Sequence, residues 1–170
     1  MNATEILTDL AARPLDAAVR LRPALTAEFL NAHPHHDNSA AWLLWHAARE
    51  IDEQLSQLSG AEPLWTQRGF EPHFGLALEP HDLGYGHSPE QARSVVITDA
   101  DLLLEYLAAT VGAQIEYLGT LGNAALSDII DTRWDPPVTR GARLVSISAD
   151  ALAHVEQVAY LAGMGAGAFE

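Results

Sequence analysis

Between positions 96 and 118, mostly apolar side chains recur at intervals of three or four residues. This spacing aligns them in one stripe along an α-helix, whereas a strand would alternate its faces every second residue. A stripe of this length predicts a long amphipathic helix that ends near Gly119 and buries one face. The stripe consists of Val96, Ala100, Leu103, Leu107, Val111, Gln114 and Leu118.

Two sets of capping residues indicate where helices begin. Ser88, Pro89 and Gln91 supply an N-cap, a proline at the first helical position and a capping-box partner. We therefore expect the helix that carries the stripe to start there. Asn38 or Ser39 can cap another helix in the same way, because their side-chain oxygens accept from backbone N–H groups of the first turn.

Three further segments show helical spacing of apolar residues. We expect a first helix over residues 4–30, with bends at Pro14 and Pro23 because proline lacks the N–H that a helix interior needs. A second helix is expected from the cap at Asn38 or Ser39 to about Ser59. A fourth is expected from about Gly141 to Ala162. The segment 96–118 is then the third of four long helices.

The segments between these helices predict the topology. Residues 60–87 contain too many prolines and glycines for a long helix, and they form a long crossover between the second and third helices. A short helical piece is expected over 124–130, a break at 134–137, and a frayed end over 163–170. The chain has 170 residues, of which 48% are apolar, enough for one core. We predict one all-α domain over residues 1–170, a four-helix bundle without a strand pair.

Composition excludes several classes of function. The net charge is −14, and all nine basic residues are arginines that form no cluster, which disfavours nucleic acid and anionic membranes as partners. No apolar run reaches the roughly 20 residues of a membrane-spanning helix, and the N-terminus lacks the basic region of a signal peptide, so we expect a cytoplasmic protein. Cysteine is absent, so any metal must bind nitrogen and oxygen ligands.

Three residues are candidate metal ligands. His46 is the only ionisable side chain in residues 40–48, so we expect it to point into the interior. Asp150 and His154 lie four residues apart, on one face of the fourth helix. Two imidazoles and one carboxylate suit a divalent ion such as zinc and leave a position for water or substrate. The alternatives are a histidine satisfied by one carbonyl or hydroxyl, and an Asp150 to His154 hydrogen bond without a metal.

Further residues are candidates for supporting roles. Glu50, one turn from His46, is a reserve ligand, and Gln157 can hold a ligand in place, although surface placement explains both equally well. Arg49 can hold an anionic group. We expect the remaining histidines to be solvated in loops, and these are His33, His35, His36, His73, His81 and His87.

With these residues, the chain resembles the DinB-like superfamily, which includes mycothiol-dependent maleylpyruvate isomerase relatives, and it looks like an actinobacterial branch. The pattern on the last helix is Asp150-x-x-x-His154-x-x-Gln157. The resemblance covers nearly the whole chain. Its other matching stretches are Trp42 to His46, Gly84 to Ser88, Trp134 to Val138, and Arg143 to Ser146.

The resemblance implies a four-helix bundle with a long crossover, commonly dimeric, that holds a divalent metal, often zinc or nickel, on three histidines. Asp150 stands where the family pattern has the first histidine of the last helix. The better understood members are similar to S-transferases and isomerases that use mycothiol, bacillithiol or glutathione, with the metal binding the thiol. The resemblance therefore predicts a thiol-dependent enzyme that acts on a small electrophile.

Two other functions remain open at the level of sequence. One is metal-assisted hydrolysis, in which Asp150 or Glu50 handles protons. The other is a stress-linked binding or scaffold protein whose metal site has decayed, which the replacement of a histidine by Asp150 would fit. Convergence of His46, Asp150 and His154 in the fold would argue against this last reading.

Overall fold

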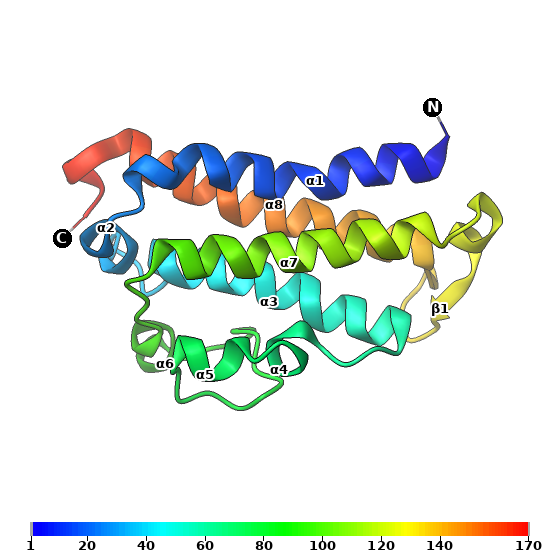
Figure 1. The fold of residues 1–170 in the computed structure, drawn as a ribbon, viewed down its shortest axis with the longest axis horizontal. Helices are drawn as coiled ribbons and strands as arrows, with labels where there is room; N and C mark the ends of the chain where they lie inside the picture. The colour runs from blue at the N-terminus through cyan, green and yellow to red at the C-terminus, as the bar shows by residue number, and fades with distance from the viewer. Residues whose placement is uncertain (1, 170) are drawn as a thin grey trace.

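The computed structural model describes residues 2–169, and four long helices make up half of it (Figure 1). Helices α1 and α3 each pack against both α7 and α8. In Figure 1, α3 and α7 run in the same direction, as expected for helices joined by a long connection. The all-α prediction is confirmed. The bounds are α1 Ala3–Leu21, α3 Ala40–Ser59, α7 Ala100–Gly119 and α8 Arg140–Met164.

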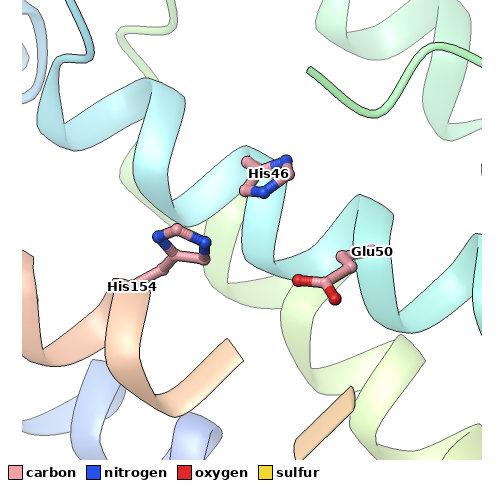
Figure 2. A group of neighbouring side chains, drawn as sticks. All are labelled: His46, Glu50 and His154. Atoms are coloured by element: carbon pink, nitrogen blue, oxygen red, sulfur yellow. The ribbon is translucent and has the colours of Figure 1, made fainter. Parts of the chain in front are cut away.

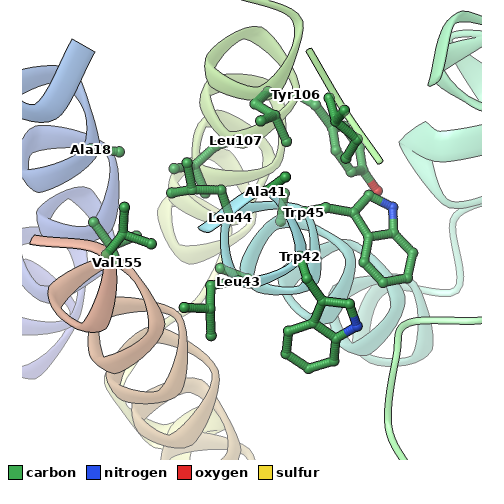
Figure 3. Close-up of a cluster of buried hydrophobic side chains, with 14 of the residues drawn as sticks. Ala18, Ala41, Trp42, Leu43, Leu44, Trp45, Tyr106, Leu107 and Val155 are labelled. Carbon is green, nitrogen blue, oxygen red and sulfur yellow. The ribbon is translucent and has the colours of Figure 1, made fainter. Parts of the chain in front are cut away.

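The main hydrophobic core lies between these four helices. Each contributes buried apolar side chains, among them Ala18 from α1, Leu44 from α3, Leu107 from α7 and Val155 from α8 (Figure 3). Helix α3 is the most enclosed of the four, because every residue from 40 to 52 is buried, including its ionisable ones. Burial of this kind places any functional side chain of α3 in a largely dry environment.

The first predicted helix is interrupted near its second proline. Helix α1 contains Pro14 but ends at Leu21, and a 3₁₀ turn over Arg22–Ala24 follows, with Pro23 in its first turn. A separate short helix, α2, covers Ala27–Asn31. The bend expected at Pro23 is therefore a complete break, since the ring removes a donor and clashes with the preceding turn.

The third predicted helix begins later than the capping signal suggested. The capping box of Ser88 and Gln91 starts a separate short helix, α6, over Pro89–Ser94. Helix α7 starts only at Ala100, where the Asp99 side chain accepts from the N–H groups of Asp101 and Leu102. The prediction of one continuous helix was wrong because residues 95–98 are all β-branched and form neither helix nor strand.

The crossover is folded onto the helices and contains two more short helices, α4 over Leu64–Gln67 and α5 over Phe70–Phe74. Three of its rings, Trp65, Phe70 and Phe74, pack around Tyr106 of α7 with ring centroids 4.7 to 5.7 Å apart. This aromatic cluster holds the crossover against the outer side of α3 and α7.

A small antiparallel strand pair lies between α7 and α8, contrary to the expectation of none. Strand β1, Ile129–Asp131, pairs with β2, Val138–Thr139. The segment expected to be helical over 124–130 is a 3₁₀ helix only over Asn123–Ser127. The two β-branched isoleucines that follow favour a strand, and the proline-containing turn returns the chain to pair with it.

The C-terminal segment packs against the rest of the protein instead of fraying. A 3₁₀ helix covers Gly165–Ala168, Ala168 is buried, and the ring of Phe169 meets the ring of Phe29 edge-on at 5.7 Å. Glu170 lies outside the described residues. Among residues 2–169, no helix has the length and apolarity needed to span a bilayer.

Candidate metal centre

Three side chains from two packed helices converge at one point. His46 and Glu50 lie one turn apart on α3, and His154 projects from α8 toward them (Figure 2). Each offers one ligand atom, and the three atoms all lie within 4.8 Å of one another. The donor set is two imidazole nitrogens and one carboxylate oxygen, a combination that divalent ions such as zinc bind.

Hydrogen bonds orient both imidazoles. His46 donates from Nδ1 to the carbonyl oxygen of Leu83 in the crossover, and His154 donates from Nδ1 to Oε1 of Gln157 at 3.2 Å. With Nδ1 protonated, the lone pair lies on Nε2, which leaves that nitrogen as the ligand atom. Burial also lowers the pKa of His46, which favours the neutral, metal-binding form. Gln157 therefore contacts the candidate ligand His154, as a supporting residue would.

Glu50 is a buried acid with one unsatisfied oxygen. Its Oε1 accepts from Nε2 of Gln54 at 2.6 Å, whereas its Oε2 is buried and has no hydrogen-bond partner among the described residues. Burial, and secondarily the neighbouring carboxyl group of Asp150, raises the pKa of Glu50 to about 8. A buried oxygen without a partner is costly. A divalent cation would satisfy it, so these residues fit a metal ion.

The predicted carboxylate ligand, Asp150, lies beside this group but is not a member of it. Its Oδ1 is 3.9 Å from Nε2 of His154, and its side chain is 52% exposed. The i,i+4 spacing from His46 to Glu50 is the sequence signal for the alternative carboxylate. Nothing in the sequence marks Glu50 as buried, because its burial depends on packing of α8 and the crossover around α3.

A glycine lets the crossover approach the candidate ligand His46. Gly84 has a φ of +92°, and a Cβ atom at this position would lie 2.9 Å from the ring of Trp42 and 3.0 Å from the ring of Trp45. Only glycine fits such a position without displacement. The close approach of Gly84 brings the adjacent carbonyl of Leu83 within reach of His46.

The side chain of His87 is only 5% exposed, contrary to the expectation of a solvated loop residue. Its Nδ1 accepts from the indole N–H of Trp42 at 3.2 Å, and its Nε2 donates to Oδ1 of Asp82 at 2.9 Å. The same Asp82 oxygen accepts from the backbone N–H of Gly84 at 2.7 Å. These bonds fix the loop that carries the Leu83 carbonyl.

Arg49 is also part of the scaffold. It is fully buried and donates to the carbonyl oxygens of Asp82 and Pro80, at 3.0 and 2.9 Å, and to the hydroxyl of Tyr106 at 3.2 Å. Its guanidinium carbon lies 4.9 Å from the ring centroid of Trp65. The structure therefore places Arg49 in the network that holds the crossover, where the anionic groups near it are the carboxylates of Asp52 and Glu53, at 3.6 and 3.8 Å.

The candidate ligands lie between two cavities. A cavity of about 590 Å³ reaches His46, Glu50 and Asp150. A second cavity of about 740 Å³ lies on the other side of His154, where it meets Gln157. The first cavity gives a small molecule direct access to the carboxyl and imidazole groups, which suits a catalytic centre better than a closed structural one.

Comparison with known proteins identifies relatives without naming an activity. No family model matches the chain, and no match was found among curated proteins. The crystal structure of a conserved protein from Enterococcus faecalis has 37% sequence identity and a TM-score of 0.87, over 94% of this chain and 95% of that chain. Identity over nearly the full length of both chains indicates common ancestry as well as a common fold. The chain therefore belongs to the same protein family as this conserved Enterococcus faecalis protein.

Proposed function

We propose that the protein is a divalent-metal-dependent enzyme whose ion is held by His46, Glu50 and His154. The observation that carries the proposal is the hydrogen bonding of these three side chains. Both imidazoles have Nδ1 engaged as a donor, and Glu50 keeps a buried oxygen without a protein partner. Zinc or nickel is the preferred ion, because both bind imidazole and carboxylate ligands.

The fold belongs to the same proposal. We assign the chain to the DinB-like four-helix bundles, in which a long crossover joins the second and third long helices. Support comes from the parallel course of α3 and α7, and from the Gly84 to Ser88 stretch. That stretch follows Leu83 directly and includes the two residues, Gly84 and His87, that shape its loop.

The reaction that we propose is transfer of a small thiol to an electrophile, or an isomerisation that uses the same thiol. A bound zinc or nickel ion would favour the thiolate form of a thiol. The chain contains no cysteine, so the thiol comes from a small molecule such as mycothiol. Asp150, exposed beside His154, receives the thiol proton. The sulfur bonds to the electrophilic carbon, whose leaving group departs with the bonding electrons, and the cavity holds both reactants.

Metal content is the decisive test. Untagged wild-type protein, reconstituted with zinc and desalted, should contain one ion per chain by elemental analysis. His154→Ala and Glu50→Gln should lose most of the affinity, because each removes one of three ligands. His81→Ala is the matched control, since this side chain is 78% exposed and should change nothing. Protein that takes up no metal after reconstitution would refute the proposal.

The thiol is tested separately on metal-loaded protein. Mycothiol, bacillithiol or glutathione that binds the ion should change the visible spectrum of the cobalt-substituted protein and raise its melting temperature. The spectral change should be absent in His154→Ala. If none of the three thiols alters the spectrum or the stability, the transferase assignment fails while the metal centre stands.

Metal-assisted hydrolysis is the second candidate, and one observation favours it. Asp150 is 3.9 Å from a candidate ligand imidazole and half exposed, so water reaches it and it can act as a general base toward that water. Turnover of simple esters or amides by the zinc-loaded protein without added thiol would select this reaction. Convergence of the two histidines with Glu50 supports either enzyme over a scaffold with a decayed site.

A further inference from the structure

One arginine beside the cavity has no hydrogen-bond partner among residues 2–169. Arg143 lies on α8 with its side chain only 21% exposed, and its nearest carboxylate oxygen, Oδ2 of Asp131, is 3.7 Å away. Asp131 already accepts two bonds from the guanidinium of Arg133, at 3.0 and 2.8 Å, and one from the backbone N–H of Arg133. A guanidinium has five donors, and none of those of Arg143 is hydrogen-bonded within the described residues, so they can bind an acceptor that enters the cavity.

Two exposed aromatic rings line the same cavity. Tyr85 extends from the crossover and is 91% exposed, and Trp134 extends from the connection between β1 and β2 and is 64% exposed. These rings come from segments far apart in the sequence and bury little of their surface in the protein. Large aromatic rings left exposed around a cavity provide contact area for a flat apolar ligand group.

The spacing along α8 relates Arg143 to the candidate metal centre. Arg143, Ser146 and Asp150 all line the cavity, and their intervals of three and four residues put them on one face of the helix, which His154 continues. At a rise of about 1.5 Å per residue, Arg143 and Asp150 are roughly 10 Å apart along the axis. One small molecule can therefore contact Arg143 with one end and the metal centre with the other.

We propose that Arg143 anchors the carboxylate of a small aryl-substituted acid, with the aromatic ring between Tyr85 and Trp134. The proposal rests on the proposed function only in placing the reactive end of this acid at His46, Glu50 and His154. A carboxylate accepts two parallel N–H bonds from a guanidinium, which matches the unpaired donors. Because the chain carries a net charge of −14, an anion binds only where such a local cation compensates.

The test uses 3-phenylpropanoate as the probe and its neutral amide, 3-phenylpropanamide, as the comparison. Both are titrated into the full chain by calorimetry, with and without bound zinc. The wild type should bind the acid at least about tenfold more tightly than the amide, since only the acid forms the charge-assisted pair. Arg143→Gln should remove this preference, and Arg143→Lys should restore part of it.

A matched control removes the same charge elsewhere. Arg13→Gln alters an exposed arginine on α1 that pairs with Asp9, and it should leave binding of the acid within about twofold of wild type. Equal binding of acid and amide by the wild type overturns the proposal, and this comparison needs no folded variant. Equal binding of the acid by Arg143→Gln and wild type overturns it as well.

The two proposals fail in distinguishable ways. Protein that takes up zinc but does not prefer the acid would refute the Arg143 site and leave the metal centre intact. Protein that binds the acid through Arg143 but takes up no zinc would support the Arg143 site and refute the metal centre. Binding of the probe should change the tryptophan emission of the wild type. If this change is absent in Trp134→Phe while calorimetry still detects binding, the result supports contact between the probe and the Trp134 ring.

Discussion

Gly84→Ala should weaken both the fold and the candidate metal centre, because Gly84 lets the crossover lie close to His46. The added methyl group would lie 2.9 Å from the Trp42 ring, 3.0 Å from the Trp45 ring and 3.3 Å from Nδ1 of His46. The first separation is shorter than real Cβ contacts, the second is tighter than nine in ten of them, and both rings are buried in the core. The loop therefore has to move away from α3, and the Leu83 carbonyl moves with it.

The magnitude follows from two contributions. A non-glycine residue at a positive φ costs about 1–2 kcal/mol, and forcing a methyl group into a packed site costs typically about 1–3 kcal/mol more. We expect Gly84→Ala to lower the free energy of unfolding by roughly 2–5 kcal/mol. Loss of the bond that orients His46 should also weaken zinc binding by about 10–100-fold.

Gly86→Ala is the matched control on the same loop. Gly86 has a φ of +76°, but apart from its chain neighbours no described residue has an atom within 4 Å of the Cβ that alanine would add. This variant should carry only the backbone cost of about 1–2 kcal/mol and bind zinc like the wild type. Urea unfolding of the metal-free protein and a competitive zinc titration measure the two effects. Equal stability and equal zinc affinity for the two variants would refute the role assigned to Gly84.

Three further predictions follow from the structure. Zinc affinity should rise with pH up to about 8, and zinc binding at pH 7 should release a proton, because the raised pKa of Glu50 keeps this residue protonated in the metal-free protein. Calorimetry in two buffers of different ionisation enthalpy detects that proton. If no proton is released, Glu50 is not a ligand. Asp131→Asn should destabilise the protein at neutral pH but not in strong acid. Hydrogen bonds from Arg133 lower the pKa of Asp131 in the folded protein. The stability that Asp131 contributes is therefore present above its unfolded-state pKa and is lost as the pH falls through its folded-state pKa. Urea unfolding at several pH values tests this, and a pH-independent difference would count against it. Leu44→Ala should cost about 2–5 kcal/mol in the same assay, because the side chain is fully buried between the four helices; a loss under 1 kcal/mol would contradict that packing.

Local sequence signals located most of the helical structure. The stripe from Ala100 to Leu118 lies on α7, and the cap at Ser39 begins α3 as predicted. The same kind of signal failed at Val96, which lies in the irregular segment between two helices and is 57% exposed. Periodicity describes which residues could share a helix face, but the β-branched run at 95–98 breaks the helix locally.

The side chains that meet at the candidate metal centre were predicted only in part, because their convergence depends on packing between distant segments. His46, His154 and the supporting Gln157 were identifiable from their spacing and surroundings. The choice between Glu50 and Asp150 was not, since both lie one turn from a histidine and differ only in how α8 and the crossover cover them.

The sequence alone determined the properties that arise within one segment: helix periodicity, the caps at Ser39 and Ser88, and the absence of a protein thiol. The tertiary structure decided which polar groups are enclosed. His87 was expected at the surface, and Arg49 was expected to hold an anionic group. Both side chains are instead enclosed and hydrogen-bonded to Asp82 of the crossover. The physical reason is that burial belongs to the assembled helices: a side chain is removed from water only by neighbours that the chain brings from elsewhere.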